Sequence, residues 1–224
     1  PEKIITTTNN TKIISDLNIA ADGKNSFVRS FYKATMFKKN YNKKALVLNI
    51  SHSYNHNNTA YEFFYKNGPL AILPMKIKQN NYLSSIVWTN NSKYLDQVIR
   101  LNKNDIISIL NEKTKNTIGD ISNIFSMQLF PVTAHINSYF YNTRLIYIGD
   151  SAHSIHPIAG QGWNLGMNDV ETLYTISKKY KSLGIEFGNR NFCKDYHDNT
   201  FYKAYRMYQL TDKLDSLFQQ QNYL

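Results

Sequence analysis

The chain has 224 residues, a formal net charge of +10 and a single cysteine, Cys193. This length is enough for one large domain or two small ones with a buried core. No apolar run approaches the ~20 residues that span a bilayer, and no signal-peptide pattern is present. A lone cysteine excludes an internal disulfide and favours a reducing compartment. The chain opens with Pro1, which suggests a piece of a longer product.

The positive charge accompanies heavy use of Lys, Asn, Ile and Tyr. We interpret this composition mainly as the drift typical of AT-rich genomes. Attraction to anionic lipid or nucleic acid is the alternative, because summed positive charge draws such partners non-specifically. The lysines are scattered along the chain and do not form one basic arm, so nucleic acid is not expected as a partner.

The first half of the chain is rich in predicted β-structure. Residues 11–23 form a β segment that ends at an Asp-Gly pair, and residues 45–90 form an antiparallel meander of short β-branched and aromatic runs. Asn67-Gly68 lies between two of these runs and predicts a hairpin with a type I′ turn, which needs positive φ at both central positions. Residues 126–136 form a further extended run.

A helix is predicted over residues 103–113. Ile106, Ile107 and Leu110 share one face of this helix. Asn104 is its expected N-cap, because a side-chain oxygen at that position accepts from a free backbone N–H.

A strand over residues 145–148 ends at a Gly-Asp pair and is followed by a glycine-rich stretch and another helix. The apolar residues of this helix recur at helical spacing: Val170, Leu173, Ile176 and Tyr180. After a loop marked by Gly184 and Gly188, a last helical region carries two stripes, for which ordinary packing is the expected role: Phe201, Tyr205 and Tyr208, then Leu210, Leu214 and Leu217.

The glycine-rich stretch has the properties of a ligand site. Asp150 comes directly after its strand, and ligands of α/β sheets gather at the carboxyl ends of strands. Pro157 stiffens the loop, while Gly160 and Gly162 permit a close approach that a Cβ would block. The helix that starts near Trp163 directs free N–H groups and a positive dipole end at the same space, which favours an anionic group.

Other interpretations of this stretch are weaker. His153 and His156 form an H-x-x-H pair, but the neighbouring proline and glycines favour a loop and no third ligand is near, so no metal site is predicted. The Gly-Asp-Ser run at 149–151 lacks the G-x-S-x-G elbow of a serine nucleophile. A purely structural glycine-rich turn that enters a helix remains an alternative.

Residues 149–164 read G-D-x-x-H-x-x-x-P-x-x-G-x-G-x-N, and residues 21–29 read A-D-G-x-x-S-x-x-R. Both resemble signature motifs of the group A FAD-dependent aromatic monooxygenases. Four more segments resemble the ubiquinone-biosynthesis hydroxylase branch of that family, in the same order: 67–75, 84–89, 130–136 and 211–218. The family opens with a G-x-G-x-x-G unit, and nothing like it precedes Asp22. The chain therefore resembles the C-terminal portion of such an enzyme.

The resemblance implies a mixed α+β and α/β fold. This would be a truncated Rossmann-like FAD/NAD(P)-binding fold of the p-hydroxybenzoate-hydroxylase type, with an antiparallel substrate-domain sheet and C-terminal helices. Residues 1–35 would be the remainder of the FAD-binding domain, 36–140 the substrate-binding sheet, 141–185 a second FAD-binding segment and 186–224 a C-terminal helical region.

The activity implied is that of an FAD-dependent monooxygenase which hydroxylates the aromatic ring of a polyprenyl phenol in ubiquinone biosynthesis, with O₂ and with NAD(P)H as the reductant. It implies a cytoplasmic location, peripheral on the inner face of the membrane, with contacts to lipid or to other ubiquinone-biosynthesis proteins. Two alternatives stay open. One is a truncated, non-catalytic remnant or accessory protein of the same fold; the other is a related flavoprotein that acts on another aromatic or prenyl substrate.

Roles for individual residues also follow from the resemblance. Asp150 would bind the ribityl chain, whereas Pro157 and Gly162, beside the flavin ring, are the candidate catalytic positions. The cofactor-binding candidates are Asp22, Gly23, Arg29, Gly149, Asp150, Pro157, Gly160, Gly162, Trp163 and Asn164. The substrate-binding candidates, for each of which core packing is the alternative, are Phe63, Phe64, Leu73 and Trp88.

Overall fold

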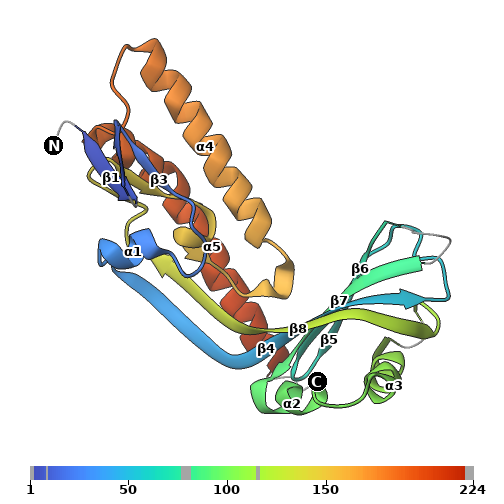
Figure 1. Cartoon of the computed structure of the whole chain (residues 1–224). Helices are drawn as coiled ribbons and strands as arrows, with labels where there is room; N and C mark the ends of the chain where they lie inside the picture. Colours follow the sequence, from blue (N-terminus) through green and yellow to red (C-terminus); the bar gives the residue numbers. More distant parts are fainter. Residues whose placement is uncertain (1–2, 9, 77–81, 115–116, 220–224) are drawn as a thin grey trace. The chain divides into compact units, whose positions relative to one another are not determined.

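The structure is a computed structural model (Figure 1). It describes residues 3–8, 10–76, 82–114 and 117–219. Among the helices of these residues, none combines the length and the apolar character needed to cross a membrane.

The chain divides into two compact units. Unit 1 consists of Pro1–Lys39 and Thr133–Lys213, and unit 2 consists of Asn40–Val132 and Leu214–Leu224. Each unit is therefore assembled from two separate stretches of sequence. The four-part division expected from the sequence is a finer one, and its boundaries stay a prediction.

Unit 1 combines short strands with two long helices. Its complete elements are β1 (Ile4–Thr8), β2 (Thr11–Ser15), β3 (Asn18–Ala20), α1 (Phe27–Phe31), β9 (Tyr141–Asn142), β10 (Leu145–Tyr147), the 3₁₀ turns η1 (Gly149–Ser151) and η2 (Pro157–Ala159), β11 (His153–Ser154) and α4 (Gly162–Ser182), and it holds most of α5 (Arg190–Gln219). Strands β1 and β2 form an antiparallel hairpin, so the predicted β segment at 11–23 is two strands. A second sheet has the order β3-β10-β9, in which β3 and β10 are parallel.

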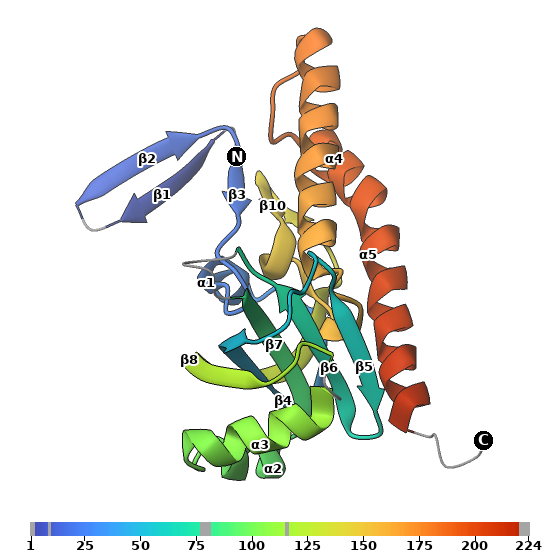
Figure 2. The ribbon, with the colours of Figure 1, turned by 90° about the vertical axis from the view of Figure 1, so that its right-hand side faces the viewer.

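The two long helices of unit 1 pack against each other in opposite directions (Figures 1 and 2). The Lys203 ammonium donates to the Asn168 side chain near the start of α4, and the Tyr180 hydroxyl donates to Asp195 at 3.0 Å near its end. The buried core beneath the pair includes Ile146, Tyr147, Leu165, Ile176, Tyr180, Phe192, Cys193 and Tyr196.

Unit 2 is built on an antiparallel sheet. Its elements are β5 (Tyr61–Tyr65), β6 (Gly68–Pro74), β7 (Tyr82–Asn91), α2 (Ser92–Val98), α3 (Lys103–Thr114) and most of β4 (Met36–His52) and β8 (Ile121–Asn137). Within unit 2 the strand order is β8-β4-β7-β6-β5, so β5, β6 and β7 form the predicted meander and β4 lies beside β7. Strand β11 of unit 1 pairs with His135 and Ile136, the part of β8 that belongs to unit 1. Helices α2 and α3 bury Leu95, Val98, Ile106 and Leu110 in the core of this unit. The mixed α+β and α/β class predicted from the sequence is confirmed.

The β5–β6 hairpin is confirmed, but the type I′ turn centred on Asn67-Gly68 is wrong. Tyr65 pairs with Gly68, so the two connecting residues are Lys66 and Asn67. Neither is among the non-glycine residues with positive φ, whereas Gly68 already lies in β6 with φ of +139°. A Cβ at Gly68 would lie 2.5 Å from the carbonyl oxygen of Thr89, so this glycine serves the close approach of β7.

The predicted helix over 103–113 is confirmed as α3, but its N-cap is Asn102 and not Asn104. The Asn102 side-chain oxygen accepts from the Asp105 N–H at 3.0 Å, and its amide donates to the Asp105 carboxylate at 2.7 Å. The Asn102 side chain thereby satisfies the Asp105 N–H, one of the free donors at the helix start.

The apolar stripes of the last two helices differ from the prediction at three positions. In α4, Val170 is 46% exposed, and the buried position beside it belongs to Asp169, which is 1% exposed. In α5, Leu210 and Leu217 are mostly exposed, so the packing expected of that stripe is wrong for both.

Candidate functional site

The two acidic signature turns lie side by side because they end neighbouring parallel strands. Tyr147 of β10 pairs with Ala20 of β3, and the Ile148 N–H donates to the Ala20 carbonyl at 3.0 Å. The carboxyl ends of parallel strands meet at one edge of a sheet. Asp22 and Asp150 therefore leave the sheet at the same edge.

Asp150 lies in η1 with its side chain exposed to solvent. The preceding Gly149 has φ of +56°, a left-handed conformation that a side chain disfavours. Helix α4 passes close to this turn, because a Cβ at Gly166 would lie 3.6 Å from the Cα of Gly149. The turn thus presents a carboxylate outward while its backbone is in contact with the helix.

The start of α4 is open. Its N-cap residue, Gln161, makes no capping hydrogen bond with its side chain. The helical bond from the Leu165 N–H reaches the Gln161 carbonyl at 3.0 Å, so the N–H groups of the three preceding residues have no acceptor within the helix. Those residues, Gly162, Trp163 and Asn164, are exposed, and Trp163 is 77% exposed. A negatively charged or electron-rich group is the partner that such a helix start favours.

The loop before α4 is shaped by proline and glycine. Pro157 begins η2 and is exposed, and the His156 ring accepts from the Ile158 N–H at 3.2 Å to cap this turn. Gly160 ends the turn with φ of +60°. No atom lies within 4 Å of a Cβ built at Gly160 or at Gly162, so the space above these glycines is free.

Arg29 connects the two signature turns. It is 7% exposed, and its guanidinium donates to the carbonyls of Lys24 in the first turn and Ser151 in the second, the latter at 3.1 Å. It also lies 3.0 Å from Nε2 of His135. Burial, reinforced by the positive charge of Arg29, lowers the pKa of His135 to about 4, so this ring is neutral and can accept from the guanidinium.

The Asp22 side chain makes a hydrogen bond within its own turn. Its carboxylate accepts from the Val28 N–H at 3.0 Å, near the start of α1. Although burial raises the pKa of Asp22, hydrogen bonds from the Ser26 side chain and the Val28 backbone outweigh it and lower that pKa. The next residue, Gly23, has φ of +81°. Asp22 therefore acts as a local cap in this structure.

Sequence comparison decides the family. The pattern described as "FAD binding domain" matches residues 5–179, which is most of the chain. The chain belongs to the FAD binding domain family.

Relatives in this family include ubiquinone hydroxylases. The chain is 30% identical over 202 residues to the ubiquinone hydroxylase UbiL of Rhodospirillum rubrum, with 90% of this chain and 46% of the relative covered. It is 27% identical over 184 residues to the 3-demethoxyubiquinol 3-hydroxylase of Escherichia coli, with 82% and 46% covered. The chain thus spans about half the length of the curated relatives it matches. The predicted resemblance to this branch is confirmed.

Solved structures support the same fold. PqsL of Pseudomonas aeruginosa in complex with 2-aminobenzoylacetate has a TM-score of 0.78 at 14% identity, with 94% of this chain and 57% of PqsL covered. The 2,6-dihydroxypyridine-3-hydroxylase of Arthrobacter nicotinovorans has a TM-score of 0.71 at 16% identity, with 100% and 63% covered. The predicted FAD-binding fold is therefore confirmed.

The substrate-binding candidates lie on two faces of the sheet of unit 2. Phe63 pairs with Leu70, and Leu70 with Trp88, which places Phe63 and Trp88 on the face that packs against α2 and α3. Trp88 is fully buried, with the Lys113 ammonium 5.0 Å from the centre of its ring. The core of unit 2 encloses Trp88, which matches the packing alternative given for it, and its contact with a substrate stays a prediction. Phe63 is partly buried against the same core.

Phe64 and Leu73 lie on the opposite face of this sheet. Successive side chains along a strand point to opposite faces of the sheet. Phe64 is next to Phe63 in β5, and Leu73 is next to the buried Ile72 in β6, so both point away from the core. They are 45% and 42% exposed. Only these two of the four candidates share an accessible face.

The residues of the disfavoured alternatives have structural partners. Nε2 of His153 lies 2.7 Å from Oδ2 of Asp169, and His156 caps η2. The Ser151 hydroxyl is buried within hydrogen-bond distance of the carbonyl oxygens of Ala20 and Ile148. These contacts give all three side chains a role in holding the turns.

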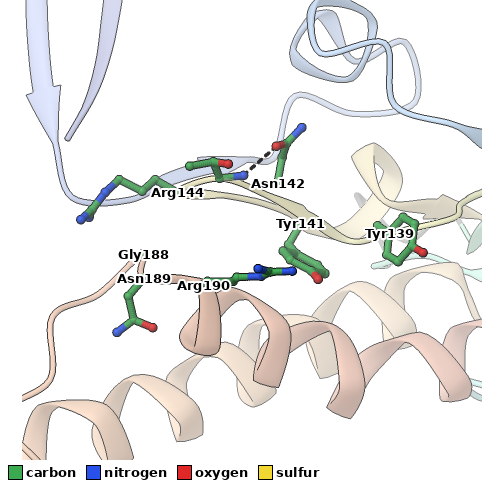
Figure 3. Close-up of a pocket in the computed structure, with 8 residues that line it drawn as sticks. Tyr139, Tyr141, Asn142, Arg144, Gly188, Asn189 and Arg190 are labelled. Atoms are coloured by element: carbon green, nitrogen blue, oxygen red, sulfur yellow. Dashed lines mark hydrogen bonds between the residues drawn. The ribbon is translucent and has the colours of Figure 1, made fainter. Parts of the chain in front are cut away.

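A separate pocket of about 800 Å³ lies at the other end of β10. It is lined by Tyr139, Tyr141, Asn142, Thr143, Arg144, Gly188, Asn189 and Arg190. Figure 3 shows the Arg190 side chain extending toward Tyr141. Because Thr143 and Arg144 precede β10 and Asp150 follows it, this pocket is not part of the candidate cofactor site.

Sequence reasoning missed two residues of the site, Asp169 and His135. Asp169 had a detectable signal, because it precedes Leu173, Ile176 and Tyr180 by four, seven and eleven residues and so shares their helix face. A carboxylate on an apolar helix face needs a buried partner. His135 had no comparable signal, since it lies 106 residues from Arg29.

Proposed function

We propose that this chain forms part of the flavin site of an FAD-dependent monooxygenase that hydroxylates the aromatic ring of a polyprenyl phenol in ubiquinone biosynthesis. One observation carries the proposal: an exposed carboxylate, Asp150, and an uncapped helix start, Gly162–Asn164, belong to elements in contact with each other. Family membership and the names of the relatives support it.

The residues present fit FAD. An exposed carboxylate beside a glycine suits the hydroxyls of a ribityl chain, which donate hydrogen bonds to it. The free N–H groups of Gly162, Trp163 and Asn164 suit the edge of the flavin ring that is negative after reduction. The open space above Gly160 and Gly162 leaves room for a planar ring to approach the backbone.

In this proposal the protein positions the cofactor and the substrate, and the cofactor carries out the reaction. Hydroxylation by O₂, with NAD(P)H as the reductant, is chemistry that FAD supplies when bound. Pro157 and Gly162 would border the reacting face of the ring, and Trp163 would cover its rim. Arg29, Asp22 and Gly23 would hold the neighbouring turn in shape, with Arg29 fixing both turns at once.

The polyprenyl phenol is the proposed substrate, and Phe64 and Leu73 are its proposed contacts because both are apolar and accessible. A substrate with a polyprenyl tail partitions into the bilayer. We therefore propose a cytoplasmic location with peripheral contact to the inner face of the membrane, to which the net charge of +10 would add attraction for anionic lipid. Association with other ubiquinone-biosynthesis proteins fits the same location.

Titration of the ¹⁵N-labelled chain with FAD tests the cofactor site directly. The chain covers about half of its relatives' length, so we expect affinity weaker than micromolar, which NMR titration can follow. Shifts should concentrate at residues 149–151 and 160–164, and Asp150→Ala should weaken binding by about tenfold or more, as for loss of a charged hydrogen-bond partner. Asp198→Ala, on an exposed site of α5, is the matched control.

Shifts that avoid both segments would contradict the cofactor assignment. The substrate assignment has a separate test in a strain that lacks the gene. Accumulation of an under-hydroxylated polyprenyl phenol, detected by mass spectrometry, would support it. An unchanged quinone profile would instead favour a non-catalytic protein or another substrate.

A further inference from the structure

Asp169 is the most deeply buried carboxylate near the candidate site. It lies on the core-facing side of α4 and is 1% exposed. Its Oδ2 accepts from the Gly149 N–H at 2.8 Å and lies 2.7 Å from Nε2 of His153. A single carboxylate oxygen therefore joins α4, η1 and β11.

The backbone around Asp150 is held from two sides by buried side chains of opposite charge. Asp169 accepts from the N–H that precedes Asp150, and Arg29 donates to the carbonyl of Ser151 at 3.1 Å and lies 3.5 Å from that of Asp150 itself. The Gly149 carbonyl accepts from the Ala152 N–H at 2.8 Å. Hydrogen bonds to ionised groups are the stronger class, so these anchors leave little freedom to the turn.

Asp169 also fixes the turn relative to the start of α4. Helix α4 begins at Gly162, where it offers the free N–H groups. Two turns later the same helix carries Asp169, which accepts from the Gly149 N–H. Gly166, three residues before Asp169, permits the close approach between helix and turn. The contact of Asp169 with Gly149 thereby links the turn that carries Asp150 to the helix that carries the open start.

We propose that Asp169 is a positioning residue that sets the distance between the Asp150 carboxylate and the N–H groups at the start of α4. This inference rests on the proposed flavin site. His153 holds the Asp169 side chain in place, and because the carboxylate accepts, the ring carries its proton on Nε2. The His153 ring in turn packs 5.4 Å from the ring of Phe140.

The cost of burying Asp169 favours positioning over packing as its role. Its second oxygen, Oδ1, is buried and has no hydrogen-bond partner in the described part of the chain. Buried carboxylates with incomplete partners stabilise a fold less than apolar residues of similar volume. An apolar residue at this point of the helix could not accept from the Gly149 N–H or from the His153 ring.

The test compares Asp169→Leu with the wild type and with Asp198→Leu, the same change at an exposed position of α5. Leucine removes both carboxylate oxygens, whereas asparagine would keep an oxygen that can still accept from the Gly149 N–H. In the ¹⁵N-labelled chain, we expect exchange of the Gly149 amide with solvent to accelerate by about tenfold to a hundredfold, as for loss of a charged acceptor. At the FAD concentration that half-saturates the wild type, the shifts at residues 160–164 should disappear in Asp169→Leu and persist in Asp198→Leu.

The outcomes separate this inference from the proposed function. A folded Asp169→Leu chain with unchanged Gly149 exchange, or with faster exchange but unchanged FAD binding, overturns the positioning role. A wild-type chain with a protected Gly149 amide and no FAD shifts overturns the flavin site while the contact itself stands. If Asp169→Leu does not fold, an unprotected Gly149 amide in the wild type overturns the inference, and a protected one supports it.

Discussion

Asp22 and Asp150 differ in what their carboxylates do, although both follow neighbouring parallel strands at the same sheet edge. Asp22 accepts from the backbone of Val28 and serves the start of a short helix. Asp150 leaves its carboxylate exposed, while its backbone is held by Asp169 and Arg29. The same residue type at a shared sheet edge therefore does not give the same function.

The difference follows from where the nearest free N–H groups lie. Helix α1 begins five residues after Asp22, within reach of its side chain. The next helix start after Asp150 that lacks a side-chain cap is that of α4, twelve residues later, where Gly162 begins the helix. Asp150 and the residues at this helix start are therefore exposed, and the helix start has no side-chain cap.

Removal of Arg29 should have the largest effect, because it supports both turns. Arg29→Met removes the guanidinium donor to the Lys24 carbonyl and leaves the Ser151 carbonyl with only its hydrogen bond from the Asn137 side-chain amide at 3.1 Å. We expect a loss of about 3 kcal/mol in the free energy of unfolding. Urea unfolding followed by circular dichroism measures it, since the long helices α4 and α5 dominate the signal. Arg190→Met, at an exposed position, is the control. A loss below about 1 kcal/mol would show that the turns stand without their shared anchor.

Acid should weaken the same anchor through His135. The folded chain has a His135 pKa of about 4 against 6.5 for an ordinary histidine, so the unfolded chain binds more protons between these values. The contribution of neutral His135 to the free energy of unfolding is therefore complete above pH 6.5. It is lost as the pH falls toward 4, by at most about 3 kcal/mol. His135→Gln should flatten the fall in urea stability over this range.

The His135→Gln variant is needed because His52 and His197 also have lowered pKa values, caused mainly by burial. These two histidines also reduce the free energy of unfolding as the pH falls, so the wild type alone does not isolate the contribution of His135. An equally steep fall in His135→Gln would place the pH dependence elsewhere.

Truncation of Asp22 should have a moderate, purely structural effect. Asp22→Ala removes the acceptor for the Val28 N–H, and loss of such a cap costs about 1 kcal/mol of unfolding free energy. Asp22→Asn retains an oxygen acceptor and should recover most of the loss in the same urea experiment. If asparagine is as damaging as alanine, the charge of Asp22 has a role beyond capping.

Truncation of Asp150 should have the smallest effect on stability. Its carboxylate is exposed, so Asp150→Ala should change the free energy of unfolding by no more than about 0.5 kcal/mol, even though FAD binding weakens. Urea curves of the alanine variants at 22 and 150, measured side by side, give the contrast. A larger loss at 150 than at 22 would reverse the assignment of the two roles.

The sequence by itself determined most of the elements and the location of the candidate site. Alternating and β-branched runs gave the strands of unit 2, and the Gly-Asp turn with its glycines located the start of α4. Local chemistry was less certain, because Asn102 and Asn104 are equally good caps and only the helix boundary distinguishes them. Trp88 fits a binding wall or a core equally well by type.

Only the tertiary structure decided which polar groups meet. The contact of Arg29 with His135 joins residues 106 apart, and the contact of Asp169 with Gly149 joins residues 20 apart. Periodicity records which face of a helix or strand is buried, but it carries no information about what that face packs against. The anchors of Asp150 therefore appear only once the helix and both turns have been brought together.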